Sequence, residues 1–136
     1  MAEELRPGLV GEAELVCGPE TAASRFGAEG IEVLATPIMV GLMEHAAIRA
    51  ADRALPDGSQ TVGTSMSFKH MAATPLGVRI RARAELTEVD GRRLVFRIEA
   101  FDPWEQIGSA DHERFVIQRD RFLARVAEKA SRPPTG

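Results

Sequence analysis

The chain has 136 residues, of which 44% are hydrophobic and 27% are charged, and its net charge is −3. This length and composition indicate one globular domain with a core of its own. The weak negative charge excludes the basic surface that a nucleic-acid-binding domain requires. The single cysteine, Cys17, cannot form a disulfide within the chain, so we expect an intracellular, cytoplasmic protein.

Several other classes are also excluded by pattern. The N-terminal segment Met1–Pro7 is acidic and lacks the apolar stretch of a secretory signal. No apolar run approaches the roughly 18 residues that a membrane-spanning helix needs. The three histidines and one cysteine lack the spacing of a metal site. Neither a serine-hydrolase elbow nor a glycine motif for nucleotides is present. We therefore expect no membrane, metal or nucleic-acid partner.

The first half of the chain predicts one strand and one long helix. Residues 9–17 alternate loosely and predict a strand, and the glycine- and proline-rich residues 18–35 predict a long loop. Thr36 and Pro37 predict a helix start, with threonine as the N-cap and proline at the first helical position. The helix runs to a turn cluster at residues 56–59 and is apolar on most sides, so we expect it to be buried.

The second half predicts a sheet. The predicted elements are strands at residues 61–71, 77–89, 92–101 and 104–118, an exposed helix at residues 119–130 and a flexible tail at residues 131–136. The second of these strands alternates apolar and charged residues, which indicates one buried face. Asp90-Gly91 predicts a hairpin, and Gly108 predicts an irregular last strand. The sequence therefore predicts one α+β domain over residues 1–136, with an antiparallel sheet around one central helix.

Three residues are candidates for chemistry. Glu44 is a carboxylate within the apolar helix, which suggests catalysis, although it could instead belong to a solvent-facing stripe with Arg49 and Asp52. His70 could shuttle protons or hydrogen-bond a carboxylate, or it could be an ordinary strand histidine. Thr36 could serve as the N-cap, or its hydroxyl could bind or activate an oxygen, and both roles can hold together.

The remaining polar candidates are weaker. His45 neighbours Glu44 on the helix and should point about 100° away from it. His112 is interpreted as structural, whereas Arg114, two residues further along the same strand, could pair with a buried carboxylate. The three arginines within residues 79–83 form a stripe that is either a solvated strand face or a contact for the phosphates of coenzyme A.

Four segments of the chain closely resemble the fluoroacetyl-CoA thioesterases and their hot-dog-fold relatives. They are ATPIMVGLMEHAAIRA (35–50), VGTSMSFKHMAATP (62–75), EVDGRRLVFRIEAFD (88–102) and EQIGSADHERFVI (105–117). The resemblance extends over roughly residues 5–130 and implies a hot-dog fold. It further implies a homodimer, possibly assembled into a higher oligomer, that hydrolyses a small acyl-CoA thioester without a cofactor at the subunit interface.

The resemblance also implies roles for single residues. Thr36, Glu44 and His70 match the catalytic set of the family, and Gly63 and Arg114 match positions that contact substrate. We expect the Gly63 amide and Thr36 to polarise the thioester carbonyl, and Glu44 to act as nucleophile or as general base on water. His70 would orient Glu44 or Thr36 and protonate the leaving thiolate. The alternatives are a non-catalytic acyl-CoA-binding protein and a hot-dog enoyl-CoA hydratase.

Two further expectations follow. The fluoroacetyl-selective enzyme has phenylalanines shortly before its catalytic threonine, which act as a lid over the acyl pocket. Residues 26–31 of this chain hold two glycines at or near those places, so we expect a different or broader acyl preference. In addition, Thr36 and Glu44 lie about 12 Å apart if all the intervening residues are helical. Either the helix starts late or the site is shared between two subunits.

Overall fold

The computed structural model describes residues 4–136 and contains one five-stranded antiparallel sheet with strand order β1-β3-β4-β5-β2. The strands are β1 (Val10–Val16), β2 (Ser59–His70), β3 (Arg79–Asp90), β4 (Arg93–Phe101) and β5 (Gln106–Gln118). The helices are α1 (Thr36–Ala51) and α2 (Arg119–Ala130), with short 3₁₀ turns η1 (Pro19–Thr21), η2 (Ala23–Phe26) and η3 (Asp52–Ala54). The N-terminal segment Met1–Pro7 is predicted not to be a secretory signal. Its first three residues lie outside the residues that the structure describes.

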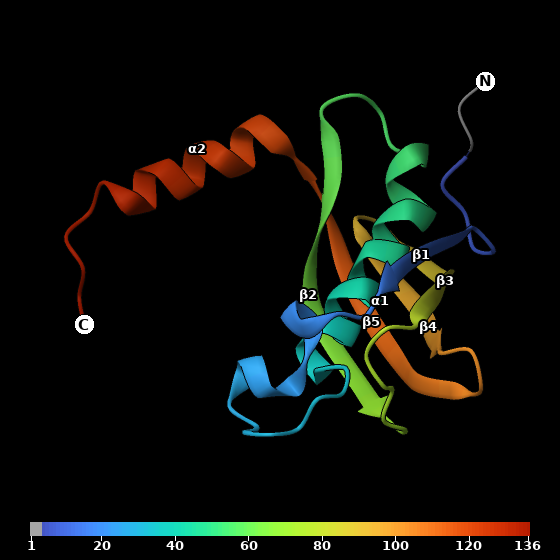
Figure 1. Ribbon diagram of the computed structural model, residues 1–136. Helices are drawn as coiled ribbons and strands as arrows, with labels where there is room; N and C mark the ends of the chain where they lie inside the picture. Colours follow the sequence, from blue (N-terminus) through green and yellow to red (C-terminus); the bar gives the residue numbers. More distant parts are fainter. Residues whose placement is uncertain (1–3) are drawn as a thin grey trace.

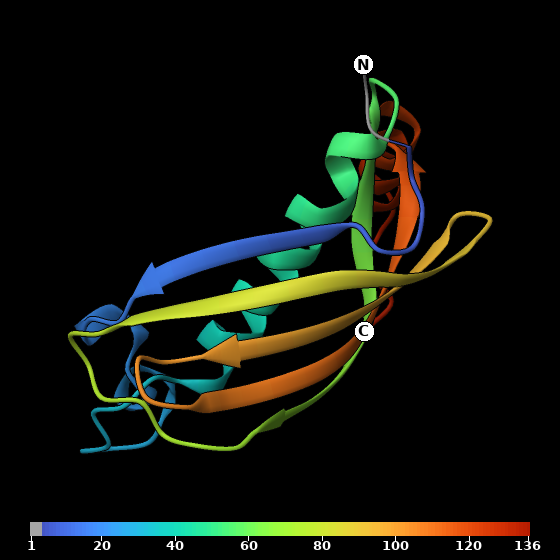
Figure 2. The same cartoon turned by 90° about the vertical axis from the view of Figure 1, so that its right-hand side faces the viewer.

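The sheet curls around α1, as Figures 1 and 2 show from two directions. The buried face of α1 carries Met39, Leu42, Met43 and four alanines, and it packs against apolar side chains of β3 and β4. Small residues allow a close approach: a methyl group at Gly11 of β1 would collide with the main chain of α1 at Ala46 and Ala50. The predicted sheet around one central helix is confirmed.

Most of the predicted elements are also confirmed. The alternation in β3 buries Ile80, Ala82, Ala84 and Leu86 completely. Strands β3 and β4 join through a two-residue turn at Gly91 and Arg92, where Gly91 has a φ of +59°. Such left-handed turns match the twist of paired strands. The irregularity near Gly108 appears as a register shift, since Gly108 faces Ala100 but Gln106 faces Phe101.

One local prediction is wrong. Thr36 is the first residue of α1, not its N-cap; that position is taken by Ala35, whose side chain makes no capping bond. The threonine hydroxyl has a stronger partner elsewhere in the fold, described below. The predicted long loop before α1 contains two short 3₁₀ turns, η1 and η2.

Strand β2 and helix α2 are the least covered parts of the fold. β2 forms one edge of the sheet, and most of its residues from Gly63 to Lys69 are exposed. α2 follows directly from β5 and extends away from the sheet on the side of β2 (Figure 1). Within residues 4–136, no helix combines the length and apolar character needed to cross a membrane.

Candidate active site

The first cluster of functional groups lies at the start of α1. The Thr36 hydroxyl oxygen is 2.8 Å from Nδ1 of His70, the last residue of β2. His70 Nε2 is buried and has no hydrogen-bond partner among the described residues. Burial lowers the pKa of His70, so its ring is neutral at pH 7. The pair lines a hollow of about 310 Å³ together with Val33, Leu34 and Met71.

The second cluster lies two turns further along α1. Glu44 is not deeply buried: 43% of its side chain is exposed, although its helix is otherwise largely apolar. Its Oε2 accepts a hydrogen bond of 2.9 Å from Nη1 of Arg114, whose own side chain is only 3% exposed. Arg114 thus pairs with a carboxylate, as predicted, but Glu44 is partly exposed rather than buried. The other carboxylate oxygen, Oε1, accepts no hydrogen bond from residues 4–136, and the Glu44 side chain lines a hollow of about 210 Å³.

Arg114 is fixed by a network that starts at the end of α1. Its Nε donates to the Thr61 hydroxyl at 2.8 Å, and its Nη2 donates to the Thr61 carbonyl at 2.9 Å. The Thr61 hydroxyl in turn donates to Asp52 Oδ1 at 2.7 Å, and its main-chain N–H donates to Oδ2 at 3.1 Å. A guanidinium has five N–H donors in a rigid plane. Anchoring two of its nitrogens on Thr61 therefore sets the direction of the third, Nη1, towards Glu44.

His112 also belongs to this second cluster, a role that sequence reasoning missed. Its Nδ1 donates to the Ser65 carbonyl at 2.7 Å, and its Nε2 accepts from Arg114 Nη1 at 3.2 Å. Burial lowers the pKa of His112, and the charge of Arg114 acts in the same direction. The signal that could have revealed it is its spacing of two residues from Arg114, which places both side chains on one face of β5.

Gly63 is the reason that β2 can approach this carboxylate so closely. It lies opposite Arg114 in the β2–β5 pairing, next to a register shift between Gly63 and Ser65. A methyl group at Gly63 would collide with Glu44 Oε2 and would lie 3.2 Å from Arg114 Nη1. Only glycine leaves this space free, so the main chain of β2 and the carboxylate share one wall of the hollow.

The structure brings the five predicted site residues together as two separate clusters. Thr36 and His70 form one cluster, and Glu44, Gly63 and Arg114 form the other. Since α1 begins at Thr36, eight helical residues place Thr36 and Glu44 about 12 Å apart along the axis. The two hollows have no lining residue in common.

The arginine stripe of β3 has a structural explanation. Arg79 pairs with Glu14 at 2.9 Å, and Arg81 pairs with Glu12 at 2.6 Å, both across the β1–β3 pairing. Arg81 also lies over the Phe101 ring. Acidic neighbours therefore neutralise much of the stripe, which favours the solvated-face interpretation over contact with phosphates. His45 points away from the site, as predicted; it is exposed and contacts Arg49.

Comparison with known proteins is consistent with this geometry. Residues 18–120 match the family model described as fluoroacetyl-CoA-specific thioesterase. A curated relative, the fluoroacetyl-CoA thioesterase of Streptantibioticus cattleyicolor, is 47% identical over 102 residues, which are 75% of this chain and 73% of the relative.

Solved structures give the same result. The structure of the fluoroacetyl-CoA thioesterase FlK is similar with a TM-score of 0.87 and 38% identity, over 96% of this chain and 100% of that one. A thioesterase superfamily member from Thermus thermophilus is similar with a TM-score of 0.84 and 27% identity, over 93% and 96% of the two chains. The hot-dog fold is therefore confirmed, and the chain belongs to the fluoroacetyl-CoA-specific thioesterase family.

Proposed function

We propose that the chain hydrolyses a small acyl-CoA thioester to the free acid and coenzyme A. The observation that carries this proposal is the paired arrangement of Thr36 on His70 and of Arg114 on Glu44. These are the residues that the family resemblance assigns to catalysis and to substrate contact. Membership of a thioesterase family supports the same reaction. The proposed chemistry uses only side chains, main chain and water, so it requires no cofactor.

Glu44 is the proposed base. With Oε2 held by Arg114, Oε1 can take a proton from a water whose oxygen attacks the thioester carbonyl carbon. The Gly63 amide and the Thr36 hydroxyl are the proposed donors to the carbonyl oxygen. The C–S bond then breaks, and the sulfur of coenzyme A takes up the proton that Glu44 removed from water.

His70 has a narrower role in this proposal than the one expected from sequence. A neutral ring at pH 7 is a poor source of a proton, because its lowered pKa disfavours the imidazolium form. In the tautomer that suits this role, Nδ1 carries the ring proton and donates it to the Thr36 oxygen, so the hydroxyl proton stays free for the carbonyl oxygen. We therefore assign His70 to orient the Thr36 hydroxyl.

Glu44 could instead attack the carbonyl carbon itself. The C–S bond would then break, coenzyme A would leave as the thiolate, and water would hydrolyse the acyl-enzyme anhydride that remains. Rapid-quench mass spectrometry separates the two mechanisms. An acyl group on the peptide that contains Glu44 would assign it as the nucleophile, whereas its absence during turnover would assign the base.

We further propose that each active site combines two subunits of a homodimer. Gly63 and His70 are seven positions apart on β2, about 23 Å along a strand, so the two clusters of one chain cannot enclose one small acyl group. β2 is an edge strand with main-chain groups available for pairing. In an antiparallel β2–β2 pairing about a two-fold axis, the end of one strand lies beside the earlier part of the other. His70 of one subunit would then approach Glu44 of its partner.

Mixing two inactive variants tests the shared site. Glu44→Gln and His70→Asn subunits, each inactive alone, should form heterodimers in which one of the two sites has no substitution. Random exchange would restore about a quarter of wild-type activity. If each site lay within one chain, no mixture would recover activity.

The expected acyl preference is broader than fluoroacetyl. Gly27 and Gly30 place no side chain near the Thr36–His70 hollow, and a methyl group at either position would contact no atom within 4 Å. Phe26 and Ile31, which flank them, are about half exposed. The segment that holds lid phenylalanines in the fluoroacetyl-selective enzyme is therefore open in this chain. A small but variable acyl group is the proposed substrate.

The first test is a coenzyme A release assay with acetyl-, fluoroacetyl-, propionyl- and phenylacetyl-CoA. Wild type should turn over at least one ester, and Glu44→Gln should reduce kcat/KM by at least about 100-fold. Binding of the esters without release would indicate an acyl-CoA-binding protein instead. Loss of enoyl-CoA absorbance without release of coenzyme A would indicate a hydratase.

Two broader proposals complete this view. We propose that residues 1–136 form one domain, which the cluster of buried apolar residues around α1, found within residues 4–136, supports. We also propose a cytoplasmic location. The free, buried thiol of Cys17 is compatible with a reducing compartment.

A further inference from the structure

Helix α2 has an apolar face that its own subunit does not cover. Phe122, Leu123, Val126, Ala127 and Ala130 recur at spacings that place them on one side of the helix. None of them is buried, and Leu123 and Val126 are 54% and 49% exposed. A helix of 12 residues is marginally stable alone in water and gains most of its stability from packing of its apolar face. This face therefore requires a surface outside its own subunit.

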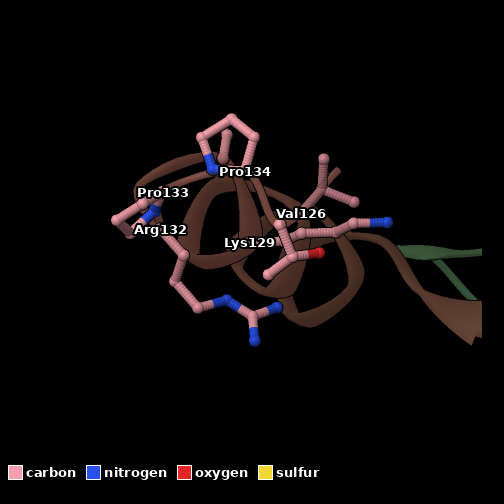
Figure 3. A pocket seen from close by; sticks show the side chains of 7 residues that line it. Val126, Lys129, Arg132, Pro133 and Pro134 are labelled. Atoms are coloured by element: carbon pink, nitrogen blue, oxygen red, sulfur yellow. The ribbon is translucent and has the colours of Figure 1, made fainter.

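The apolar face continues into a hollow at the end of the chain. This hollow, of about 630 Å³, lies between the last turns of α2 and the residues that follow (Figure 3). Val126, Ala130, Pro133 and Pro134 supply its apolar lining, and Lys129 and Arg132 supply positive charge. No acidic, histidine or cysteine side chain lines it. This composition suits docking against a protein surface better than catalysis.

The position of α2 points to a second copy of the chain. α2 starts beside the start of β2, where the main-chain N–H of Arg119 donates to the Gly58 carbonyl at 2.9 Å. From there it extends beyond the edge strand, away from β1 (Figure 1). In an antiparallel β2–β2 pairing, this region lies beside the end of the partner's strand. That end carries Phe68 and Met71, which are 42% and 51% exposed.

The distribution of charge along the chain also favours a second copy as the partner of α2. Residues 119–136, which we call the C-terminal arm, hold five basic and two acidic residues and carry a net charge of +3. The other 118 residues carry a net charge of −6, since the whole chain has −3. An arm of one sign that extends from a body of the other sign is attracted to the body of a second copy.

We infer that the C-terminal arm packs its apolar face on the partner subunit, over the end of the partner's β2 and beside its Thr36–His70 cluster. The inference rests on the dimer of the proposed function and goes beyond it. Each subunit would then contribute a wall near its partner's site in addition to the residues of β2. The occupant of the face is a second copy of this chain.

The test compares three full-length proteins by sedimentation equilibrium over a wide range of concentrations. The double variant Leu123→Gln/Val126→Gln replaces the two most exposed large apolar side chains of this face but keeps the charge and the helix propensity of α2. Val16→Gln is the matched control, because Val16 is 51% exposed and lies at the end of β1, the edge strand opposite β2. Because the dimer is two-fold symmetric, each substitution affects two equivalent contacts in the interface. The dimer dissociation constant should therefore rise at least about 100-fold in the double variant and less than about threefold in the control.

The outcomes separate this inference from the proposed function. A wild-type protein that stays monomeric at all concentrations would overturn the shared site and the inference together. A wild-type dimer with an unchanged dissociation constant in the double variant would overturn the inference alone. Sedimentation with vesicles of anionic phospholipid, lost in the double variant while dimerisation is unchanged, would assign the face to a membrane surface and would also overturn it.

Discussion

Replacing Thr61 by valine tests the hydrogen-bond network that orients Arg114 towards Glu44. Valine has nearly the shape of threonine, so the variant removes a hydroxyl without creating a cavity. The loss leaves Arg114 Nε without its acceptor in a side chain that is 3% exposed, and it frees Asp52 Oδ1. A hydrogen bond to a buried charged group contributes about 1.5–3 kcal/mol. We expect the free energy of unfolding to fall by about 2–3 kcal/mol.

Activity should fall for a separate reason. The guanidinium keeps its bond to the Thr61 carbonyl but loses one of its two anchors, so Nη1 no longer holds Glu44 in a single position. We expect kcat to fall about tenfold, equivalent to about 1.4 kcal/mol of activation free energy. KM should change less than about threefold, because Thr61 lines neither hollow of the site.

Urea unfolding at fixed protein concentration and steady-state release of coenzyme A measure the two effects. Thr61→Ser keeps the hydroxyl and should restore most of kcat. Thr87→Val, which removes an exposed hydroxyl bonded to the Val95 carbonyl, should change stability by less than about 0.5 kcal/mol. If Thr61→Val matched the Thr87 control in both stability and kcat, the network would have no role in positioning Glu44.

Three further predictions follow from the site. Gly63→Ala should lower kcat at least about 100-fold, since its methyl group collides with Glu44. The control Gly41→Ala has no atom within 4 Å of the added methyl group and should keep activity within about twofold. Equal activities of the two variants would contradict the close approach of β2 to Glu44. Thr36→Val should lower kcat at least about tenfold, because it removes the hydroxyl that bonds His70, and Thr36→Ser should restore kcat. A valine variant with full activity would show that Thr36 has no role in the reaction. Burial lowers the pKa of His70 and His112, so the unfolded chain binds more protons and stability should decline as the pH falls from about 6.5 to 5. Urea unfolding should show a shallower decline in His112→Gln, and constant stability over this range in wild type would refute the sign.

The fold was largely predictable because its signals are local. Alternation in residues 79–89 and the Asp90-Gly91 turn specify a hairpin through neighbours in the chain alone. The helix was equally clear from its apolar period. Thr36 failed as an N-cap because its hydroxyl partner, His70, lies 34 residues away, and local preferences do not register such a partner.

The site was predictable in its residue types but not in its arrangement. Family resemblance identified Glu44 and Arg114, and the structure shows them bonded. It did not reveal Asp52, Thr61 or His112, which act through strand register and through a hydrogen-bond chain between α1, β2 and β5. Their parts depend on which residues face each other across β2 and β5, and the register shift at Gly63 hides that pairing from the linear sequence.

The contact at Gly11 has a consequence for how this enzyme can change over evolutionary time. Main-chain atoms of α1 at Ala46 and Ala50 pack so closely on this glycine that any larger residue must displace the whole helix from β1. Thr36 and Glu44 both lie on that helix and would be carried along with it as one rigid body. A residue with no chemical function, on the strand furthest from β2 in the sheet, thus constrains the alignment of both halves of the site.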